Sequence, residues 1–359
     1  MSKKALIFIA MLVVAIVAMG SVSATENVTT DVAVPTEEVS VEDNVIEENN
    51  VQNVENTNVE TSTSEYTQYT VTTSSDLADI SEKIGNGTYT GYQFNFEAGT
   101  YNNFTMNTGN NNKFVGNGAN IISGGDNLFT VTGSSNIVIT GFNMTNAAGK
   151  AAVYGSNVVN FTITDNVING GKDGINIFKS YENVTITDNT IYQVSRDAIS
   201  LANPLKSDID NIGESYIMNN VIYSGSSTTM EFGIFVGGTF KGTISGNNIT
   251  NVDCAMQFAG KPTGTQGHLN VNITNNIISN VSRGIDMFHP DVISLLVEGN
   301  SITATNYSFN TNENFTNSSE NSIEVIENVI NGVVSQAFID ATYIASDNTG
   351  TDAYSKNDE

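Results

Sequence analysis

The stretches NFTITDNVI at residues 160–168 and NVTITDNTI at residues 183–191 share one pattern, in which apolar and polar residues alternate before a fixed asparagine. The pattern can be written apolar-x-apolar-x-x-Asn-x-apolar, and it returns in ESYIMNNVI, GTISGNNI, VNITNNII, LLVEGNSI and SIEVIENVI further along the chain. Strict alternation is the period of a β-strand, because successive side chains of a strand point to opposite faces. We therefore expect each copy to form a short strand that turns at its asparagine.

The shared asparagine recurs at steps of 23, 31, 27, 29, 24 and 28 residues. Its positions are Asn166, Asn189, Asn220, Asn247, Asn276, Asn300 and Asn328. Weaker copies precede these, with Phe142 and Asn117 in the equivalent place. Repeats of this length are typical of solenoids, in which each repeat buries its apolar side chains against its neighbours.

A second short strand follows each copy and opens on a small residue. Its examples are Gly174-Ile175-Asn176-Ile177, Ala198-Ile199-Ser200-Leu201, Gly233-Ile234-Phe235-Val236, Ala255-Met256-Gln257-Phe258 and Gly284-Ile285-Asp286-Met287. Leucine-rich repeats share the apolar-x-apolar-x-x-Asn core, but they need a leucine three residues earlier and a helical return segment. Here that earlier position holds residues such as Val158 and Tyr181, and the return segment is rich in glycine and β-branched residues. We therefore predict an all-β protein with the fold of a right-handed parallel β-helix.

In a β-helix each coil of the chain lies about 4.8 Å from the next, and parallel ladders join the coils. The inward residues of all coils then form one continuous core. A buried amide must have its hydrogen bonds satisfied, and stacked asparagines satisfy one another. The seven repeated asparagines are therefore expected to form a ladder at one turn of every coil.

The N-terminal side of the repeats predicts a short capping helix. Leu77, Ile80 and Ile84 recur at helical spacing between residues 75 and 84, with Ser74 or Ser75 as the N-cap and Gly85 as the stop. The following FNFEAGTYNN at residues 94–103 is expected to open the β-helix. We assign residues 66–350 to the capped β-helix and residues 351–359 to a disordered tail.

Two further segments precede the folded part. Residues 1–24 combine two lysines, an apolar run and a Val-Ser-Ala end, which is typical of a secretory signal peptide. Residues 25–65 contain eleven carboxylates and neither lysine nor arginine, a composition that predicts a disordered acidic stalk. We expect a secreted or cell-surface protein that has no membrane segment once the signal peptide is removed.

Charge and cysteine content restrict the possible partners. The formal net charge is −25, from 13 basic and 38 acidic residues, and it argues against a nucleic-acid partner because phosphate recognition needs a basic surface. A single cysteine, Cys254, excludes an internal disulfide framework, and we expect it to be a small buried residue. Several N-x-S/T sequons, among them Asn103, Asn160 and Asn183, permit glycosylation of an exported chain.

The asparagine repeats and the FEAGTY segment resemble the pectin-lyase-like β-helix superfamily, and especially adhesin-like surface proteins of methanogenic archaea. The resemblance covers roughly residues 90–345. It implies a β-helix whose activity is open, because that superfamily contains lyases, hydrolases, adhesins and accessory proteins.

Alignment of the coils on their small residue places Asp173 over Asp197, with Phe232, Cys254 and Arg283 at the same position in the next three coils. Two carboxylates one coil apart suit a shared proton, a Ca²⁺ site or the pair of a retaining glycosidase. The alternative is that both point into solvent at a turn, where Lys172 and Arg196 balance their charge. Asp173, Asp197 and Arg283 are the candidate catalytic residues, and neither a cofactor nor a transition-metal site is expected.

The hydrolases of that superfamily carry Asn-Thr-Asp, Asp-Gly, Gly-His-Gly and Arg-Ile-Lys segments, and only Asp173-Gly174 matches any of them. The resemblance therefore leaves enzymatic activity in doubt.

A candidate binding groove lies between the two longest connections, residues 203–214 and 260–268, which are expected to be its walls. Alternation points Phe235 outward, as an apolar platform for the C–H face of a sugar, unless a loop covers it. The predicted ligand-binding residues are Phe235, Asn176, Ser200, Gln257, Asp286 and His289.

Three functions remain open from the sequence. The first is an exported, adhesin-like protein that binds glycans or neighbouring surfaces. The second is a polysaccharide lyase or glycoside hydrolase that acts on acidic polysaccharide, and the third is a structural spacer. The sequence favours the first, because no complete catalytic set is present.

Overall fold

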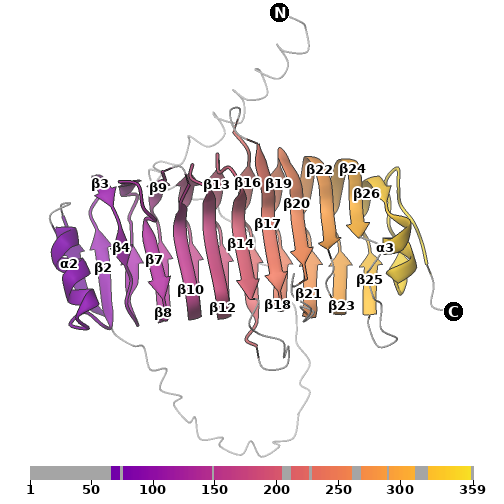
Figure 1. Ribbon diagram of the computed structural model, residues 1–359. Coiled ribbons are helices and arrows are strands. Elements are labelled where there is room, and N and C mark those ends of the chain that lie inside the picture. Colours follow the sequence, from indigo (N-terminus) through magenta and orange to yellow (C-terminus); the bar gives the residue numbers. More distant parts are fainter. Residues whose placement is uncertain are drawn as a thin grey trace, which may run out of the picture. The chain divides into compact units, whose positions relative to one another are not determined.

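The computed structural model describes residues 66–72, 76–147, 149–203, 212–225, 229–260, 268–288, 291–311 and 322–356. The predicted signal peptide and acidic stalk lie outside these residues. The described strands stack as successive parallel coils, from α2 at one end to α3 at the other (Figure 1). The prediction of an all-β solenoid is therefore confirmed. Within the described residues, no helix has both the length and the apolar character that crossing a membrane requires.

Each coil contributes to three faces, because the repeat contains three strand segments separated by turns. Face A is built by β4 (Met106–Asn107), β7 (Phe129–Thr132), β14 (Asp197–Asn203), β17 (Met230–Gly238) and β20 (Val252–Ala259), with the first part of β10 (Ala151–Thr164) and of β12 (Asp173–Thr187). The last parts of β22 (Ile277–Phe288) and β24 (Ser301–Thr311) extend it. Face A contains the second strands that the sequence predicts.

Face B contains most of the apolar-x-apolar segments that precede the asparagines. It comprises β1 (Thr67–Val71), β2 (Tyr92–Phe96), β5 (Lys113–Val115), β8 (Ser135–Thr140), the last parts of β10 and β12, β15 (Ser215–Met218), β18 (Phe240–Ser245), β21 (His268–Thr274), β23 (Asp291–Glu298), β25 (Ser322–Ile326) and β27 (Ile344–Ser346).

Face C is made of short strands that follow the asparagines. It comprises β3 (Thr100–Phe104), β6 (Asn120–Ser123), β9 (Asn143–Thr145), β11 (Val167–Asn169), β13 (Thr190–Tyr192), β16 (Val221–Tyr223), β19 (Asn248–Thr250), and the first parts of β22, β24 and β26 (Val329–Val334).

The asparagine ladder lies at the turn between faces B and C, and all seven predicted members are buried there. In each step the side-chain Nδ2 and the backbone N–H of one asparagine donate to the Oδ1 of the next. The ladder ends on a further member, Asn348, whose Oδ1 accepts from Asn328. At its other end, the side-chain Oδ1 of Asn166 accepts from the backbone N–H of Phe142. Asn117 is not in the ladder position, because the register of β6 and β9 places Ala119 beneath Phe142.

The residue before each ladder asparagine adopts a left-handed conformation. Asp165, Asn219 and Glu327 have φ values of 57°, 57° and 56°, and Gly246 takes the same place with φ of 67°. Glycine, asparagine and aspartate tolerate this conformation better than other residues. The pairs Asp-Asn, Asn-Asn and Gly-Asn in the repeats therefore belong to one turn that repeats in every coil.

Both ends of the β-helix are closed. The predicted capping helix is α2 (Asp76–Gly85), which buries Leu77, Ile80 and Ile84, and β1 precedes it as a strand that the repeat pattern did not reveal. At the other end α3 (Gln336–Ala341) buries Phe338, whose ring stacks on Phe309 with centroids 5.0 Å apart.

The prediction of a disordered tail is wrong for residues 351–356. Asp352 N donates to the carbonyl of Ile330 at 3.1 Å, and Lys356 forms an antiparallel bridge with Ala345. These bonds use backbone groups that the last coil would otherwise expose, so the segment continues the C-terminal closure. Residues 357–359 lie outside the described residues.

Candidate functional site

Asp173 and Asp197 stand at the start of adjacent strands on face A, in the alignment that the sequence predicts. The register of β12 and β14 pairs Ile175 with Ile199, two residues after each aspartate. Both carboxylates are buried, with 3% and 4% of each residue exposed. The alternative in which they point into solvent is therefore wrong, although Arg196 balances their charge as that alternative expects.

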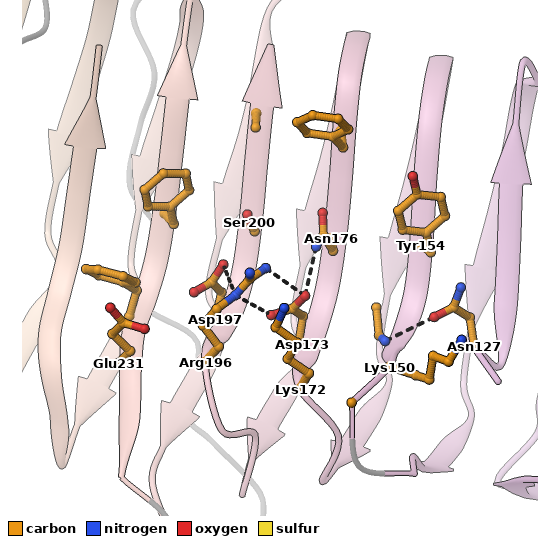
Figure 2. Close-up of a pocket in the computed structure, with 16 residues that line it drawn as sticks. Asn127, Lys150, Tyr154, Lys172, Asp173, Asn176, Arg196, Asp197, Ser200 and Glu231 are labelled. Carbon is orange, nitrogen blue, oxygen red and sulfur yellow. Dashed lines mark hydrogen bonds and ion pairs between the residues drawn. The ribbon is translucent and has the colours of Figure 1, made fainter. Parts of the chain in front are cut away.

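Arg196 lies between the two carboxylates, as Figure 2 shows. Its Nε and Nη2 donate to Oδ1 and Oδ2 of Asp173 at 3.0 and 2.9 Å, and Nε lies 3.2 Å from Oδ2 of Asp197. A guanidinium that bonds a carboxylate through two nitrogens has a fixed orientation. The place that a shared Ca²⁺ would need is thus taken by the side chain of Arg196. Among the described residues, no three groups of the His, Cys, Asp and Glu kinds come together to hold a metal ion.

The two carboxylates have different surroundings. Asp173 also accepts a bond from Nδ2 of Asn176 at 2.8 Å, so both its oxygens are bonded. Oδ1 of Asp197 is buried and has no hydrogen-bond partner among the described residues. Burial raises the pKa of Asp197 to about 6, against the lowering effects of Arg196 and of a hydrogen bond with Ser200, while Asp173 and Glu231 raise it further. Asp197 therefore takes up a proton at a higher pH than an ordinary aspartate does.

A groove of about 590 Å³ opens over this cluster. Its floor follows one outward row of face A, in which Tyr154, Asn176, Ser200 and Phe235 are in register on successive strands. Its remaining lining residues are Asn127, Gly149, Lys150, Ala151, Lys172, Asp173, Phe178, Arg196, Asp197, Ala202, Glu231 and Phe232.

Three phenylalanine rings line the groove in addition to Tyr154. Phe178 is 42% exposed, and the rings of Phe232 and Phe235 lie 5.6 Å apart at 51°. A Cβ at Gly237 would lie 3.0 Å from the ring of Phe235, so the glycine leaves room for that ring beside the sheet. The groove thus joins apolar ring surface to a fixed network of carboxylate, amide and guanidinium groups.

The predicted site residues fall into two groups. Asn176, Ser200 and Phe235 line the groove together with Asp173 and Asp197. Arg283, Asp286 and Gln257 do not; they form a second cluster further along face A, in which Arg283 bonds Asp286 and contacts Asp253 at 2.9 Å. Three coil steps, or about 14 Å, separate the backbone of Arg283 from that of Asp197. Arg283 is therefore no partner of the aspartate pair.

Other predictions lie outside the described residues. His289 is one of them, and so are most of the two connections that were expected to form the walls, residues 204–211 and 261–267. The described groove is centred nearer the N-terminus than the predicted groove, over the strands from β10 to β17.

Three of the lining residues, Phe178, Phe232 and Glu231, were not predicted as site residues. The coil alignment contained a signal for Phe178 and for Phe232. Phe178 follows Asn176 by two residues and so shares its outward direction, while Phe232 aligns with Asp197 in the next coil. The sequence analysis used the row of Asp197 and the row of Asn176, but it did not extend to the next outward row, in which Phe178 lies.

Residues 110–266 match the family model described as "Right handed beta helix region", and this range includes Asp173 and Asp197. The described coils therefore form a right-handed parallel β-helix, as the sequence predicts. Comparisons with curated proteins and with solved structures find no match.

Proposed function

We propose that this β-helix is an exported protein that binds a glycan in the groove of face A. The observation that carries the proposal is that the exposed ring of Phe178 lines the same groove as Asp173, Asn176 and Arg196, which are already hydrogen-bonded to one another. A sugar presents C–H groups on its ring faces and hydroxyl groups at its edges, and an aromatic ring with adjacent donors and acceptors satisfies both.

Pre-organisation supports binding in this groove. Asp173, Asn176 and Arg196 hold one another in place, so little side-chain freedom is lost when a ligand arrives. Arg196 has five N–H donors in all, and the bonds to Asp173 use two nitrogens, which leaves donors for a hydroxyl or carboxylate of the ligand.

The composition of the N-terminal segments and the family resemblance support an exported, adhesin-like protein. The lysine-containing apolar segment at residues 1–24 supports export, and the acidic composition of residues 25–65 supports a spacer between a surface and the β-helix. The repeats resemble those of adhesin-like surface proteins, which favours attachment to a polysaccharide or a neighbouring surface.

Glycan binding predicts that the double substitution Phe178→Ala and Phe235→Ala weakens retention on a polysaccharide at least about tenfold, because each lost ring removes roughly 1 kcal/mol or more of contact. Affinity electrophoresis on a broad set of neutral and acidic polysaccharides measures this. Phe288→Ala is the matched control, since Phe288 occupies the same outward row as Phe178 but lies outside the groove. An equal loss with Phe288→Ala, or no retention on any polysaccharide, would contradict the proposal.

A second candidate function is cleavage of an acidic polysaccharide, and the raised pKa of Asp197 favours it. A carboxylic acid with a pKa near 6 beside a second carboxylate is the arrangement that glycoside hydrolases use to protonate a leaving group. We expect release of reducing ends, with a rate that Asp197→Asn lowers at least about a hundredfold. A lyase would instead release unsaturated products, detected by their ultraviolet absorbance. Product release that is unchanged by Asp197→Asn would exclude the aspartate pair from the chemistry.

A further inference from the structure

The short strands of face C carry no charged residue at their outward positions. From β9 to β26 the triplets read NMT, VIN, TIY, VIY, NIT, IIS, SIT and VIN, with a buried central residue and two outward residues each. No outward position of these triplets is Asp, Glu, Lys or Arg, although the chain has 38 acidic residues. We call these eight triplets the neutral strip.

One row of the neutral strip exposes apolar side chains at every second coil. Val167, Val221, Ile277 and Val329 are 37%, 39%, 54% and 40% exposed. The register places all four in one line, with Thr190, Asn248 and Ser301 between them. Exposed apolar groups gathered on one surface commonly mark an interaction site.

The neighbouring row adds a pair of stacked tyrosine rings. The rings of Tyr192 and Tyr223 lie on adjacent coils with centroids 5.2 Å apart and planes within 7° of each other. Their register along β13 and β16 places them beside Thr190 and Val221. Hydroxyl and amide groups continue this row, as at Thr250 and Ser279, whose side-chain oxygens lie 3.3 Å apart.

We propose that the neutral strip binds an uncharged, extended, β-1,4-linked polysaccharide that runs along the axis of the β-helix. In such a chain each ring is turned over relative to the one before it, so the same ring face recurs at every second sugar. One sugar advances the chain by close to one coil spacing of about 4.8 Å. The two-coil period of Val167, Val221, Ile277 and Val329 therefore matches the two-sugar period of the ligand.

The dimensions of the neutral strip favour a single polysaccharide chain over a second copy of the protein. Eight triplets span about 34 Å along the axis, and three residues of strand span about 10 Å across it. The resulting area of about 350 Å² is far below the roughly 800 Å² per partner of a stable protein interface. Its lack of charge favours a neutral ligand, because no cation on the strip offsets the repulsion between an anionic polymer and a chain of net charge −25.

The neutral strip is separate from the groove of face A, so each can be tested while the other is intact. The full-length protein is examined by affinity electrophoresis against hydroxyethyl cellulose, with carboxymethyl cellulose as a charged polymer of the same backbone. We expect retention by hydroxyethyl cellulose, and at least tenfold weaker retention by carboxymethyl cellulose at low salt. The double substitution Tyr192→Ala and Tyr223→Ala is expected to weaken retention by hydroxyethyl cellulose at least tenfold, and Ile277→Glu to weaken it similarly.

Tyr216→Ala is the matched control, since Tyr216 lies on face B in the same coil as Tyr223. Retention that is unchanged in Tyr216→Ala but weakened in the Tyr192→Ala and Tyr223→Ala variant and in Ile277→Glu would support the neutral strip as the site. Absence of retention by hydroxyethyl cellulose would overturn the proposal, as would an equal loss with Tyr216→Ala. A dimer that sedimentation detects and that Ile277→Glu dissociates would also overturn it, because a second copy would then cover the strip.

Discussion

Asn247→Ala is expected to lower the free energy of unfolding by about 4 kcal/mol or more, because it leaves several buried polar groups without partners at about 1–3 kcal/mol each. Oδ1 of Asn247 accepts from the backbone N and from Nδ2 of Asn220 at 3.0 and 2.9 Å. Its Nδ2 donates to the carbonyls of Ile217 and Ser245 and to Oδ1 of Asn276. All three asparagines are completely buried, so water cannot replace the lost bonds without opening the coil.

Asn248→Ala provides the control for this substitution. Asn248 is the next residue in the chain and is exposed on face C, so its replacement should change the free energy of unfolding by no more than about 0.5 kcal/mol. Denaturant unfolding followed by circular dichroism compares the two variants with the parent chain. Because solenoid coils interact chiefly with their neighbours, the transition of Asn247→Ala is also expected to broaden. Equal midpoints for the two variants would show that the ladder contributes little to stability.

The ladder was predictable from the sequence because its geometry requires one residue type. Each amide of the ladder both donates and accepts along the stack. If an apolar residue replaces it, the polar groups of the coils on either side lose their hydrogen-bond partners. The ends of the ladder were less predictable. Asn348 follows a segment without the alternating pattern, and Ala119 replaces the amide where the core is filled by large rings such as Phe96 and Phe142. Packing of these rings, which no single repeat reveals, determines the fold of the first coils.

The sequence predicted which site residues are aligned on neighbouring coils, but it did not predict their side-chain contacts. Alignment of the coils correctly placed Asp173 beside Asp197, because parallel coils keep the spacing of their small residues. Alignment carries no information on rotamers, so it did not reveal that Arg196 turns from its own coil toward Asp173. Nor did it reveal that Arg283 bonds within a separate cluster. The position of the groove depends on these side-chain directions.

Asp197→Asn is expected to raise the free energy of unfolding at pH 8 by about 2–3 kcal/mol and to leave it nearly unchanged at pH 4. Burial raises the pKa of Asp197 from about 3.8 to about 6. Each pKa unit corresponds to about 1.4 kcal/mol. The unfolded chain releases this proton at a lower pH than the folded protein does, so the parent protein loses stability as pH rises from about 4 through about 6. The asparagine cannot ionise, and the variant therefore escapes that loss.

Asp173→Asn separates the effect of ionisation from the effect of lost contacts. Asp173 accepts two bonds from Arg196 and one from Asn176, so its replacement weakens a charged pair that is already satisfied and should lower stability at pH 8. In Asp197→Asn, by contrast, Arg196 keeps both bonds to Asp173. Unfolding measured from pH 4 to pH 8 for the parent and both variants gives the comparison. If Asp197→Asn were destabilised at pH 8 to the same degree as Asp173→Asn, the charge of Asp197 would be a net stabilising element. The carboxyl would then lack the raised pKa that general-acid chemistry in this groove requires.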